Sequence, residues 1–307
     1  MFEDKRVLLI VNPTSGREEG GARRTALAEE IRLRGAADVE IRVTEGPDDA
    51  LNWAAAAGAE GFQVVIAGGG DGTVTAVAHG VLRAGADLLI GIIPLGTGNG
   101  MARVLGLPLE PEATVRALAT GKAVAVDVVE VPSHDTISLL FLGAGLDAEI
   151  NRDADNAEKS RLGPLAYIKA TLTNIGKARN HDVTLQLDGR SSRLRAHTVS
   201  VLNATRFDLM GLRLGPDAQP LDGKLRAVVL SANSFLGIVG KLLRLVDKRS
   251  SRAEMEDATA IVVEASPPLP VQVDGDVVGE TPLEARILPA ALRFIAAADS
   301  SVVARAG

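Results

Sequence analysis

The 307-residue chain contains no cysteine, which excludes disulfide bonds, thiolate nucleophiles and zinc sites that need cysteine ligands. Aromatic residues make up only 3% of the chain, which argues against platforms on which nucleic-acid bases stack. The four histidines are scattered, without an HExxH motif or a pair at i, i+4, so no histidine-built metal site is expected. A basic excess is also lacking, because the formal net charge is −6, and this argues against a nucleic-acid partner.

No apolar run is long enough to span a membrane. The longest uncharged stretch, Leu88–Ala102, falls short of the roughly 18–20 apolar residues that a span needs, and glycine and proline interrupt it. The start, Met1–Arg6, carries acids where a signal peptide would carry only bases. With 46% hydrophobic and 23% charged residues the composition is globular, so we expect a cytoplasmic protein.

The first part of the chain alternates between short apolar runs and helical patterns. Strands are predicted at Val7–Val11, Val39–Val43, Phe62–Ala67 and Leu89–Ile93. Helices are predicted at Glu18–Arg34, Asp48–Ala57, Thr73–Ala84 and Glu110–Thr120. This alternation indicates βαβ units around a parallel sheet, so residues 1–124 are predicted to form an α/β domain.

Residues 125–307 have a different texture, with many short strand-like runs separated by Gly, Asp, Pro and Ser. These runs are Val124–Val131, Thr136–Leu142, Asp182–Leu187, Ser192–Leu202, Leu225–Leu230, Thr259–Glu264, Val271–Val273 and Leu292–Ala297. Two helical stretches interrupt them, Pro164–Arg179 and Phe235–Arg252. The pattern predicts a mainly antiparallel β domain, whose last residues are free to pack back on the first domain.

Three of the predicted parallel strands end in glycine-rich turns, which the topology places at one edge of the sheet. Their sequences are NPTSG (12–16), GGGDGT (68–73) and PLGTGNG (94–100). Glycines let backbone N–H groups approach an anion, helix N-termini favour phosphate, and residues such as Asn99 offer neutral donors. Asp71 fits beside phosphates if a divalent cation lies between them. Tight turns without a ligand are the alternative, while GxxxxGK[ST] and the strict GxGxxG fingerprint are absent.

These three segments, in this order and spacing, resemble the diacylglycerol kinase catalytic family, which includes bacterial lipid kinases and sphingosine kinases. NAD kinases and phosphofructokinases share the GGDGT motif alone. Further segments that resemble the family are GAGLDA (143–148), RLGPLAY (161–167), DGKL (222–225) and VDGD (273–276). The resemblance implies an α/β nucleotide domain like that of NAD kinase and phosphofructokinase, an antiparallel β-sandwich that handles the lipid, and a site between them.

The same resemblance implies which residues line the nucleotide site. They are Asn12, Pro13, Thr14, Ser15, Gly16, Thr44, Gly69, Gly70, Asp71, Gly72, Thr73, Thr75 and Thr97. Asp71 would hold the catalytic Mg²⁺ through water, and Asp127 matches a second family aspartate near that metal. A surface position at a strand turn is the alternative for Asp127.

Two motifs of the second half are expected to add a base and a second metal. Asp276 stands where the family has its general base, while Asp274 and Gly275 have the usual sequence of a type I′ hairpin turn, which could present Asp276. Asp222 matches a family aspartate that binds a structural Mg²⁺, with the backbone carbonyls of Gln219 and Lys224 as further ligands. A plain hairpin turn at Asp222 is the alternative.

The chain departs from the family pattern at three positions. Thr75-Ala76 replaces the usual Asn-Glu, Gly100 replaces an Asp, and the base is Asp276 rather than Glu. We expect an ATP- and Mg²⁺-dependent kinase that phosphorylates a hydroxyl of a membrane lipid such as diacylglycerol. A kinase of a soluble small molecule, or a degenerate homologue that binds nucleotide or lipid without turnover, stays open.

Because the chain is acidic, contact with a lipid membrane requires a local segment that can bind it. On a helical wheel Phe235–Arg252 separates apolar from basic residues, so it could lie at the inner face of the membrane. An ordinary helix packed on the second domain is the alternative. The identity of the lipid and the formation of a homodimer stay open.

Overall fold

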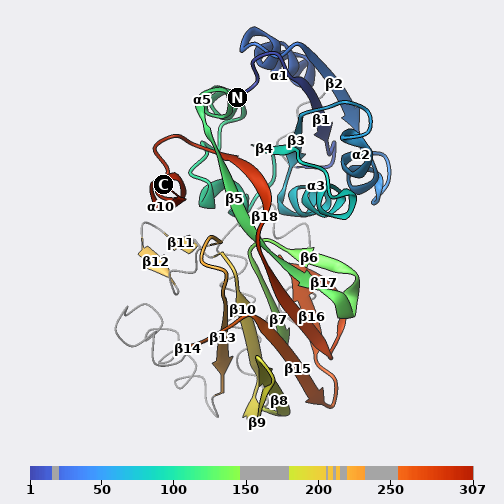
Figure 1. Ribbon diagram of the computed structural model, residues 1–307. Helices are drawn as coiled ribbons and strands as arrows, with labels where there is room; N and C mark the ends of the chain where they lie inside the picture. The colour runs from blue at the N-terminus through green and yellow to red at the C-terminus, as the bar shows by residue number, and fades with distance from the viewer. Residues whose placement is uncertain are drawn as a thin grey trace. The chain divides into compact units, whose positions relative to one another are not determined.

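The chain divides into two compact units in the computed structural model (Figure 1). The first unit consists of Met1–Asp127 and Pro289–Gly307, and the second of Val128–Leu288. The structure describes residues 1–15, 21–145, 180–204, 207–209, 212–214, 220–231 and 255–306. The predicted helices at Pro164–Arg179 and Phe235–Arg252 lie outside the described residues.

The first unit is built on a parallel sheet. Its strands are β1 (Arg6–Val11), β2 (Asp38–Val43), β3 (Val64–Gly69) and β4 (Leu89–Pro94), in the order β2-β1-β3-β4. Arg293 and Phe294, near the end of β18 (Leu283–Ala296), add a fifth parallel strand beside β4. Every residue of β3 and β4 is buried, which explains why both segments are continuous apolar runs rather than alternating ones.

Helices connect these strands, as the sequence pattern predicts. The predicted ones are α1 (Gly21–Leu33), α2 (Asp49–Ala57), α3 (Asp71–Ala84) and α5 (Pro111–Thr120). The short α4 (Gly100–Val104) and α10 (Ser301–Ala306), which follows the last strand, were not predicted. Figure 1 shows α2 and α3 side by side. Their approach requires a glycine, because a Cβ on Gly80 would lie 2.2 Å from the carbonyl oxygen of Leu51. Gly85, at φ 59°, caps the end of α3 in the left-handed conformation.

The second unit contains two antiparallel sheets. One runs β14 (Met255–Ala258), β13 (Leu225–Leu230), β10 (Thr198–Leu202), β7 (Phe141–Gly145), β16 (Pro270–Val273) and β17 (Asp276–Glu280). The other runs from the first part of β18 through β15 (Ala260–Ser266) and β8 (His181–Leu187) to β9 (Arg190–Ala196), and it includes the pair β5 (Lys122–Val131) and β6 (Thr136–Ser138). The 3-10 helix Pro132–His134 and the small pair β11 (Phe207–Leu209) and β12 (Leu212–Leu214) complete the described elements.

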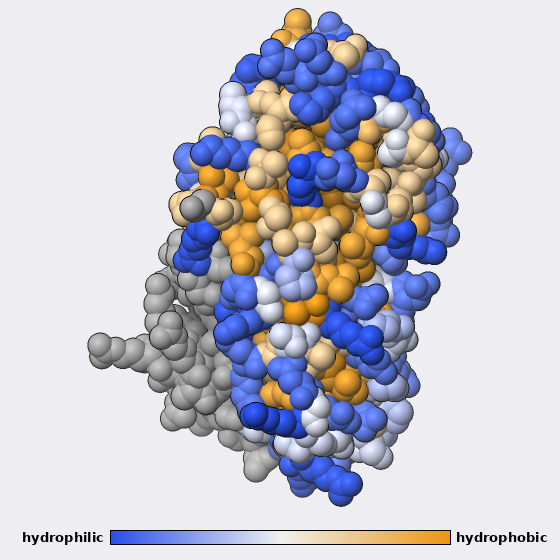
Figure 2. Space-filling model, in the orientation of Figure 1, coloured by the Kyte–Doolittle hydropathy of each residue, from blue (hydrophilic) through white to orange (hydrophobic). Residues whose placement is uncertain are grey.

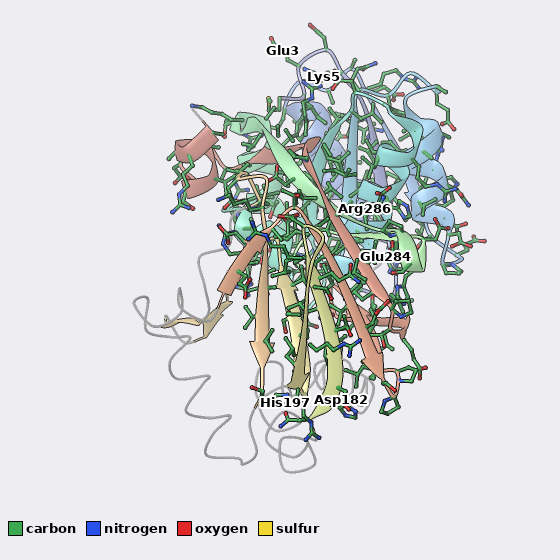
Figure 3. All side chains as sticks on the ribbon, turned by 60° about the horizontal axis from the view of Figure 1, so that its bottom comes forward. Glu3, Lys5, Asp182, His197, Glu284 and Arg286 are labelled. Carbon is green, nitrogen blue, oxygen red and sulfur yellow. The ribbon has the colours of Figure 1, made fainter. Side chains whose placement is uncertain are left out.

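A single hydrophobic core joins these two sheets. It draws Leu142, Val201 and Val271 from the first sheet and Val129 and Val263 from the second. Burying each such side chain stabilises the fold by about 1.5–3 kcal/mol. On this part of β18, Glu284 and Arg286 form a loose ion pair at 3.9 Å (Figure 3). The unit is therefore a β-sandwich, which confirms the predicted order of a parallel α/β fold followed by an antiparallel one.

Three predicted strands were wrong in extent. Leu292–Ala297 is only the end of the longer strand β18, which begins at Leu283. Thr136–Leu142 is divided into β6 and β7, with a turn at Leu139 and Leu140 between them. Ser192–Leu202 is divided at His197, since β9 pairs with β8 in one sheet and β10 pairs with β7 in the other. Hydrophobic alternation alone cannot distinguish two consecutive strands of different sheets from one long strand.

Hydrophilic side chains predominate on the outer margin of the first unit, over α1 and α2, in the face that Figure 2 shows. No helix in the described part of the chain has the length and hydropathy needed to cross a membrane.

We predict that the β8–β9 turn makes stability depend on pH. Asp188 Oδ1 accepts the hydroxyl and N–H of Thr259 and the N–H of Ala260 at 2.8–2.9 Å, and these bonds lower the pKa of Asp188. A lowered folded-state pKa adds stability above the unfolded value of about 3.9, and this stability is lost as the pH falls through the folded pKa.

The variant Asp188→Asn keeps an acceptor oxygen and loses the charge. Urea unfolding from pH 7 to pH 2.5 should therefore show a shallower loss of stability for D188N than for the parent chain. Parallel curves for the two proteins would show that Asp188 contributes nothing to acid unfolding.

Candidate active site

The carboxyl ends of the parallel strands lie level in the first unit. Val11 pairs with Gly68, and Gly68 pairs with Ile93 across the next strand. The backbone continues this alignment into the loops, because Asn12 N–H donates to Gly68 O at 2.9 Å and Leu95 N–H donates to Gly69 O at 3.0 Å. The structure thus brings the three glycine-rich segments to one edge of the sheet, where ligands bind in parallel α/β folds.

The first loop is organised by the side chain of Asn12. Its Oδ1 accepts both the N–H and the hydroxyl of Thr14, at 2.9 and 2.8 Å, and its Nδ2 donates to Thr73 Oγ1 at 3.3 Å. Pro13 and Thr14 are exposed, while Ser15 is half-buried. Gly16 lies outside the described residues. Asn12 therefore joins the first loop to the start of α3 rather than serving only as a ligand donor.

The second loop opens directly into α3. Gly70 is the N-cap and provides no side-chain hydrogen bond, so the first N–H groups of this 14-residue helix have no side-chain cap. A Cβ on Gly69 would lie 2.4 Å from Thr73 Oγ1, which requires glycine there. Gly72 is exposed and Thr75 is half-buried on the next turn. An uncapped helix start with a positive dipole end is suited to phosphate oxygens.

The third loop is closed by the buried side chain of Asn99. Its Nδ2 donates to Gly96 O at 2.6 Å, and its Oδ1 accepts Gly96 N–H at 3.1 Å. One N–H of the Asn99 amide is therefore used within its own loop, and donation of its other N–H to a phosphate stays a prediction. Thr97 is exposed on this loop, and its contact with the nucleotide stays a prediction.

Asp71 lies where the second and third loops meet. Its Oδ1 accepts the N–H of Met101 at 3.3 Å, and a Cβ on Gly98 would come within 2.9 Å of its Oδ2. Among the described residues no three Asp, Glu, His or Cys side chains form a cluster for a metal ion. One half-buried carboxylate still fits Mg²⁺, which in phosphate sites takes one or two carboxylates and completes its shell with phosphate oxygens and water.

Thr44 follows β2 at the same edge. Its N–H donates to Val11 O at 2.9 Å, and the loop beyond it is closed by Asp49 Oδ2, which accepts the N–H groups of Glu45 and Gly46 at 2.8 Å each. These two bonds lower the pKa of Asp49, because they stabilise its ionised form. The structure thus brings Thr44 to the sheet edge where the first loop begins, and its contact with the nucleotide stays a prediction.

Asp127 is only 3% exposed, so the alternative of a surface residue at a strand turn was wrong. It lies in β5 and its Oδ1 accepts the N–H of Ala290 at 2.8 Å. This bond joins β5 to the returning end of the chain within the first unit. A place near the catalytic metal stays a prediction for Asp127.

In the second unit, Asp276 begins β17 and is exposed. The turn before it has both central residues at positive φ, Asp274 at 49° and Gly275 at 101°, and it joins the pair Val273 and Asp276. The predicted type I′ hairpin turn is therefore confirmed. An exposed carboxylate at the start of an edge strand is accessible to a substrate hydroxyl.

The carboxylate of Asp274 has a part that the sequence did not reveal. It accepts the hydroxyl of Ser138 at 2.7 Å and the N–H groups of Leu139, Leu140 and Phe141 at 2.9–3.0 Å. Burial raises the pKa of Asp274, and the four hydrogen bonds oppose that rise. Asp274 thereby fixes the turn between β6 and β7 against the hairpin that presents Asp276. Local sequence patterns do not predict a contact between residues more than 130 positions apart.

Asp222 is engaged in an ion-pair network. Its Oδ2 pairs with Arg226 Nη2 at 2.5 Å and its Oδ1 accepts the N–H of Lys224 at 3.2 Å, while Lys224 Nζ reaches Asp257 at 3.3 Å. A second Mg²⁺ at Asp222 would therefore compete with the guanidinium of Arg226. Gln219 lies outside the described residues, as do Leu146–Ala148 and Arg161–Tyr167 of the other resembling segments.

Two sequence-family patterns match the chain, one on each part. The diacylglycerol kinase catalytic domain matches residues 6–131, and the YegS C-terminal NAD kinase beta sandwich-like domain matches residues 141–296. An α/β unit with glycine-rich loops at its sheet edge, followed by this sandwich, defines the class of two-domain lipid kinase folds.

Curated relatives and solved structures agree with this class. A diacylglycerol kinase of Mycobacterium tuberculosis is 32% identical over 303 residues, covering 94% of each chain, and one of Bacillus subtilis is 28% identical over 91% of this chain and 92% of its own. The crystal structure of a diacylglycerol kinase from Bacillus anthracis is 26% identical with a TM-score of 0.77, covering 95% of this chain and 97% of its own. The chain belongs to the diacylglycerol kinase family. It is an enzyme, a kinase whose acceptor is a hydroxyl group.

We predict that adding one methyl group between the second and third loops weakens nucleotide binding. A Cβ on Gly96 would lie 2.5 Å from Gly70 Cα, so Gly96→Ala must separate the two loops. Titration calorimetry with ATP should show at least tenfold weaker binding for G96A, in line with the about 1.4 kcal/mol that a tenfold loss represents.

Gly21→Ala is the matched control, since its Cβ would meet only the end of the Arg24 side chain, at 3.6 Å. Equal affinities of G96A and G21A would show that the contact between the two loops is unimportant for binding.

Proposed function

We propose that this enzyme is an ATP- and Mg²⁺-dependent lipid kinase that transfers the γ-phosphate to a hydroxyl of a membrane lipid such as diacylglycerol. The observation that carries the proposal is the alignment of three glycine loops, the uncapped N-terminus of α3 and Asp71 at one sheet edge. The names of the relatives support diacylglycerol as the acceptor, and Phe235–Arg252 is proposed as the segment that contacts the membrane.

Phosphate binding is assigned to the first unit. The N–H groups at the start of α3 and the hydroxyls of Thr14 and Thr97 are suited to hold the phosphate chain in one orientation. When bound beside Asp71, Mg²⁺ would neutralise charge on the transferring phosphate. Asn12 and Asn99 preorganise their loops before the nucleotide arrives, so the entropy cost of ordering the site is met during folding.

Proton acceptance is assigned to Asp276. As the acceptor oxygen bonds to the γ-phosphorus, the bond from that phosphorus to the bridging oxygen of ATP breaks and ADP leaves with the electron pair. The carboxylate of Asp276 takes the proton of the acceptor hydroxyl. Its exposed position at the start of β17 allows a substrate hydroxyl to come within hydrogen-bond distance.

Transfer of labelled γ-phosphate from ATP into lipids in mixed micelles tests the proposal directly. We expect label in one lipid class, with at least a 100-fold loss for Asp71→Asn and for Asp276→Asn. Both substitutions keep the side-chain size, and D71N also keeps an acceptor for Met101 N–H.

Asp87→Asn is the matched control for D71N in the first unit, and Asp182→Asn is the matched control for D276N in the second. Both control carboxylates are more than 80% exposed. ATP binding without transfer to any lipid would favour the soluble-substrate or degenerate alternatives. Ala76 and Gly100 would then be the first residues to replace with the Glu and Asp that are usual in the family.

A second Mg²⁺ at Asp222 is proposed separately and has its own test. If the ion displaces Arg226, added Mg²⁺ should raise the melting temperature of the parent protein and not of Asp222→Asn. A loss of stability in D222N that is the same with and without Mg²⁺ would instead leave Asp222 only its ion pair with Arg226.

A further inference from the structure

Gln272 is a fully buried polar residue in β16, four residues before Asp276. Its neighbours Val271 and Val273 both belong to the sandwich core, so in a strand Gln272 faces the opposite side of the sheet. Among the described residues its amide nitrogen has no hydrogen-bond partner, although its amide oxygen has one. A buried donor without a partner is costly, so the retention of glutamine at this position needs a reason.

The partner of the amide oxygen supplies that reason. The N–H of Gly275 donates to Gln272 Oε1 at 2.8 Å. Because a backbone N–H can only donate, the atom that faces it must be the oxygen, which fixes the orientation of the whole amide. The side chain therefore bridges its own strand and the second residue of the turn.

The strand that follows this turn, β17, has few restraints near Asp276, because its contact with His134 Nε2, through the carbonyl oxygen of Glu280 at 3.2 Å, lies at its far end. In the described part of the chain β17 lies at the edge of its sheet with β16 as its one pairing strand, and the register between them shifts between Val271 and Gln272. Only two residue pairs, Gln272 with Val277 and Val273 with Asp276, lie between the turn and that shift. The position of Asp276 thus depends on the turn itself, which has backbone and carboxylate bonds at Asp274 and the amide bond at Gly275.

We propose that Gln272 is a positioning residue, which fixes Gly275 through its amide oxygen and thereby sets the direction in which Asp276 is presented to the acceptor hydroxyl. The inference rests on the proposed function, because it gives Asp276 the role of base. A leucine or methionine would fill the same space without a buried unpaired donor, but neither has an oxygen for Gly275.

Two variants of similar size separate this role from a structural one. Gln272→Met removes both the bond to Gly275 and the unpaired donor, so we expect an unchanged or higher melting temperature together with a kcat lower by about 10- to 100-fold, the scale of a misplaced catalytic group. Gln272→Glu keeps an oxygen for Gly275, and we expect it to recover kcat relative to Q272M despite a lower melting temperature from the buried charge.

Hydrogen exchange of the Gly275 amide provides a readout that needs no substrate. Exchange should be fast in Q272M and slow in Q272E and in the parent chain. Gln186→Met is the matched control, a half-buried glutamine of β8 in the same unit, and it should leave both kcat and this amide unchanged.

The outcomes distinguish this inference from the proposed function. If D276N is inactive while Q272M retains kcat within twofold, the positioning role is wrong and Asp276 stands. If Q272M loses kcat and melting temperature together and Q272E restores neither, Gln272 is a packing residue. An active D276N would overturn the role of Asp276, and with it this inference.

Discussion

The hydrogen-bonded register of β1, β3 and β4 is the constraint from which the first unit's chemistry follows. β3 and β4 are fully buried and β1 is buried from Val7 on, and the level pairing of Val11, Gly68 and Ile93 brings the ends of all three strands to the same edge. The loops that follow are then close enough for Asn12 to reach Thr73 and for Gly96 to pack on Gly70. A shift of one residue in either pairing would remove these contacts, so the site depends on the sheet as a whole.

In the second unit the constraint is different, because the exposed carboxylate of Asp276 lies on an edge strand and its position must be restrained. An isolated hairpin is only marginally stable in water, and its tip is the least restrained part. Here the turn is restrained by Asp274, which accepts four hydrogen bonds from residues 138–141, and by Gln272. Polar side chains thus provide near Asp276 the rigidity that close glycine packing provides in the loops of the first unit.

Much of this arrangement could be predicted from the sequence where the signals are local. The four parallel strands, the helices between them and the type I′ turn at Asp274-Gly275 each follow from short-range rules of burial period, propensity and turn chemistry. The predictions failed where two explanations give the same local pattern. The run Ser192–Leu202 alternates like one strand, although its two halves belong to different sheets.

The sequence by itself determined which residues are candidates for a kinase site. Phosphate transfer requires glycine, hydroxyl and carboxylate residues at strand ends, and these residue types can be read directly from the sequence. Only the tertiary structure decided how each is used. Asn99 closes its own loop, Asp127 is buried against Ala290, Asp222 pairs with Arg226, and Asp274 joins a turn far away in the chain. These roles depend on hydrogen-bond partners brought together by folding, and a side chain's partner across the fold leaves no mark in its own neighbourhood of the sequence.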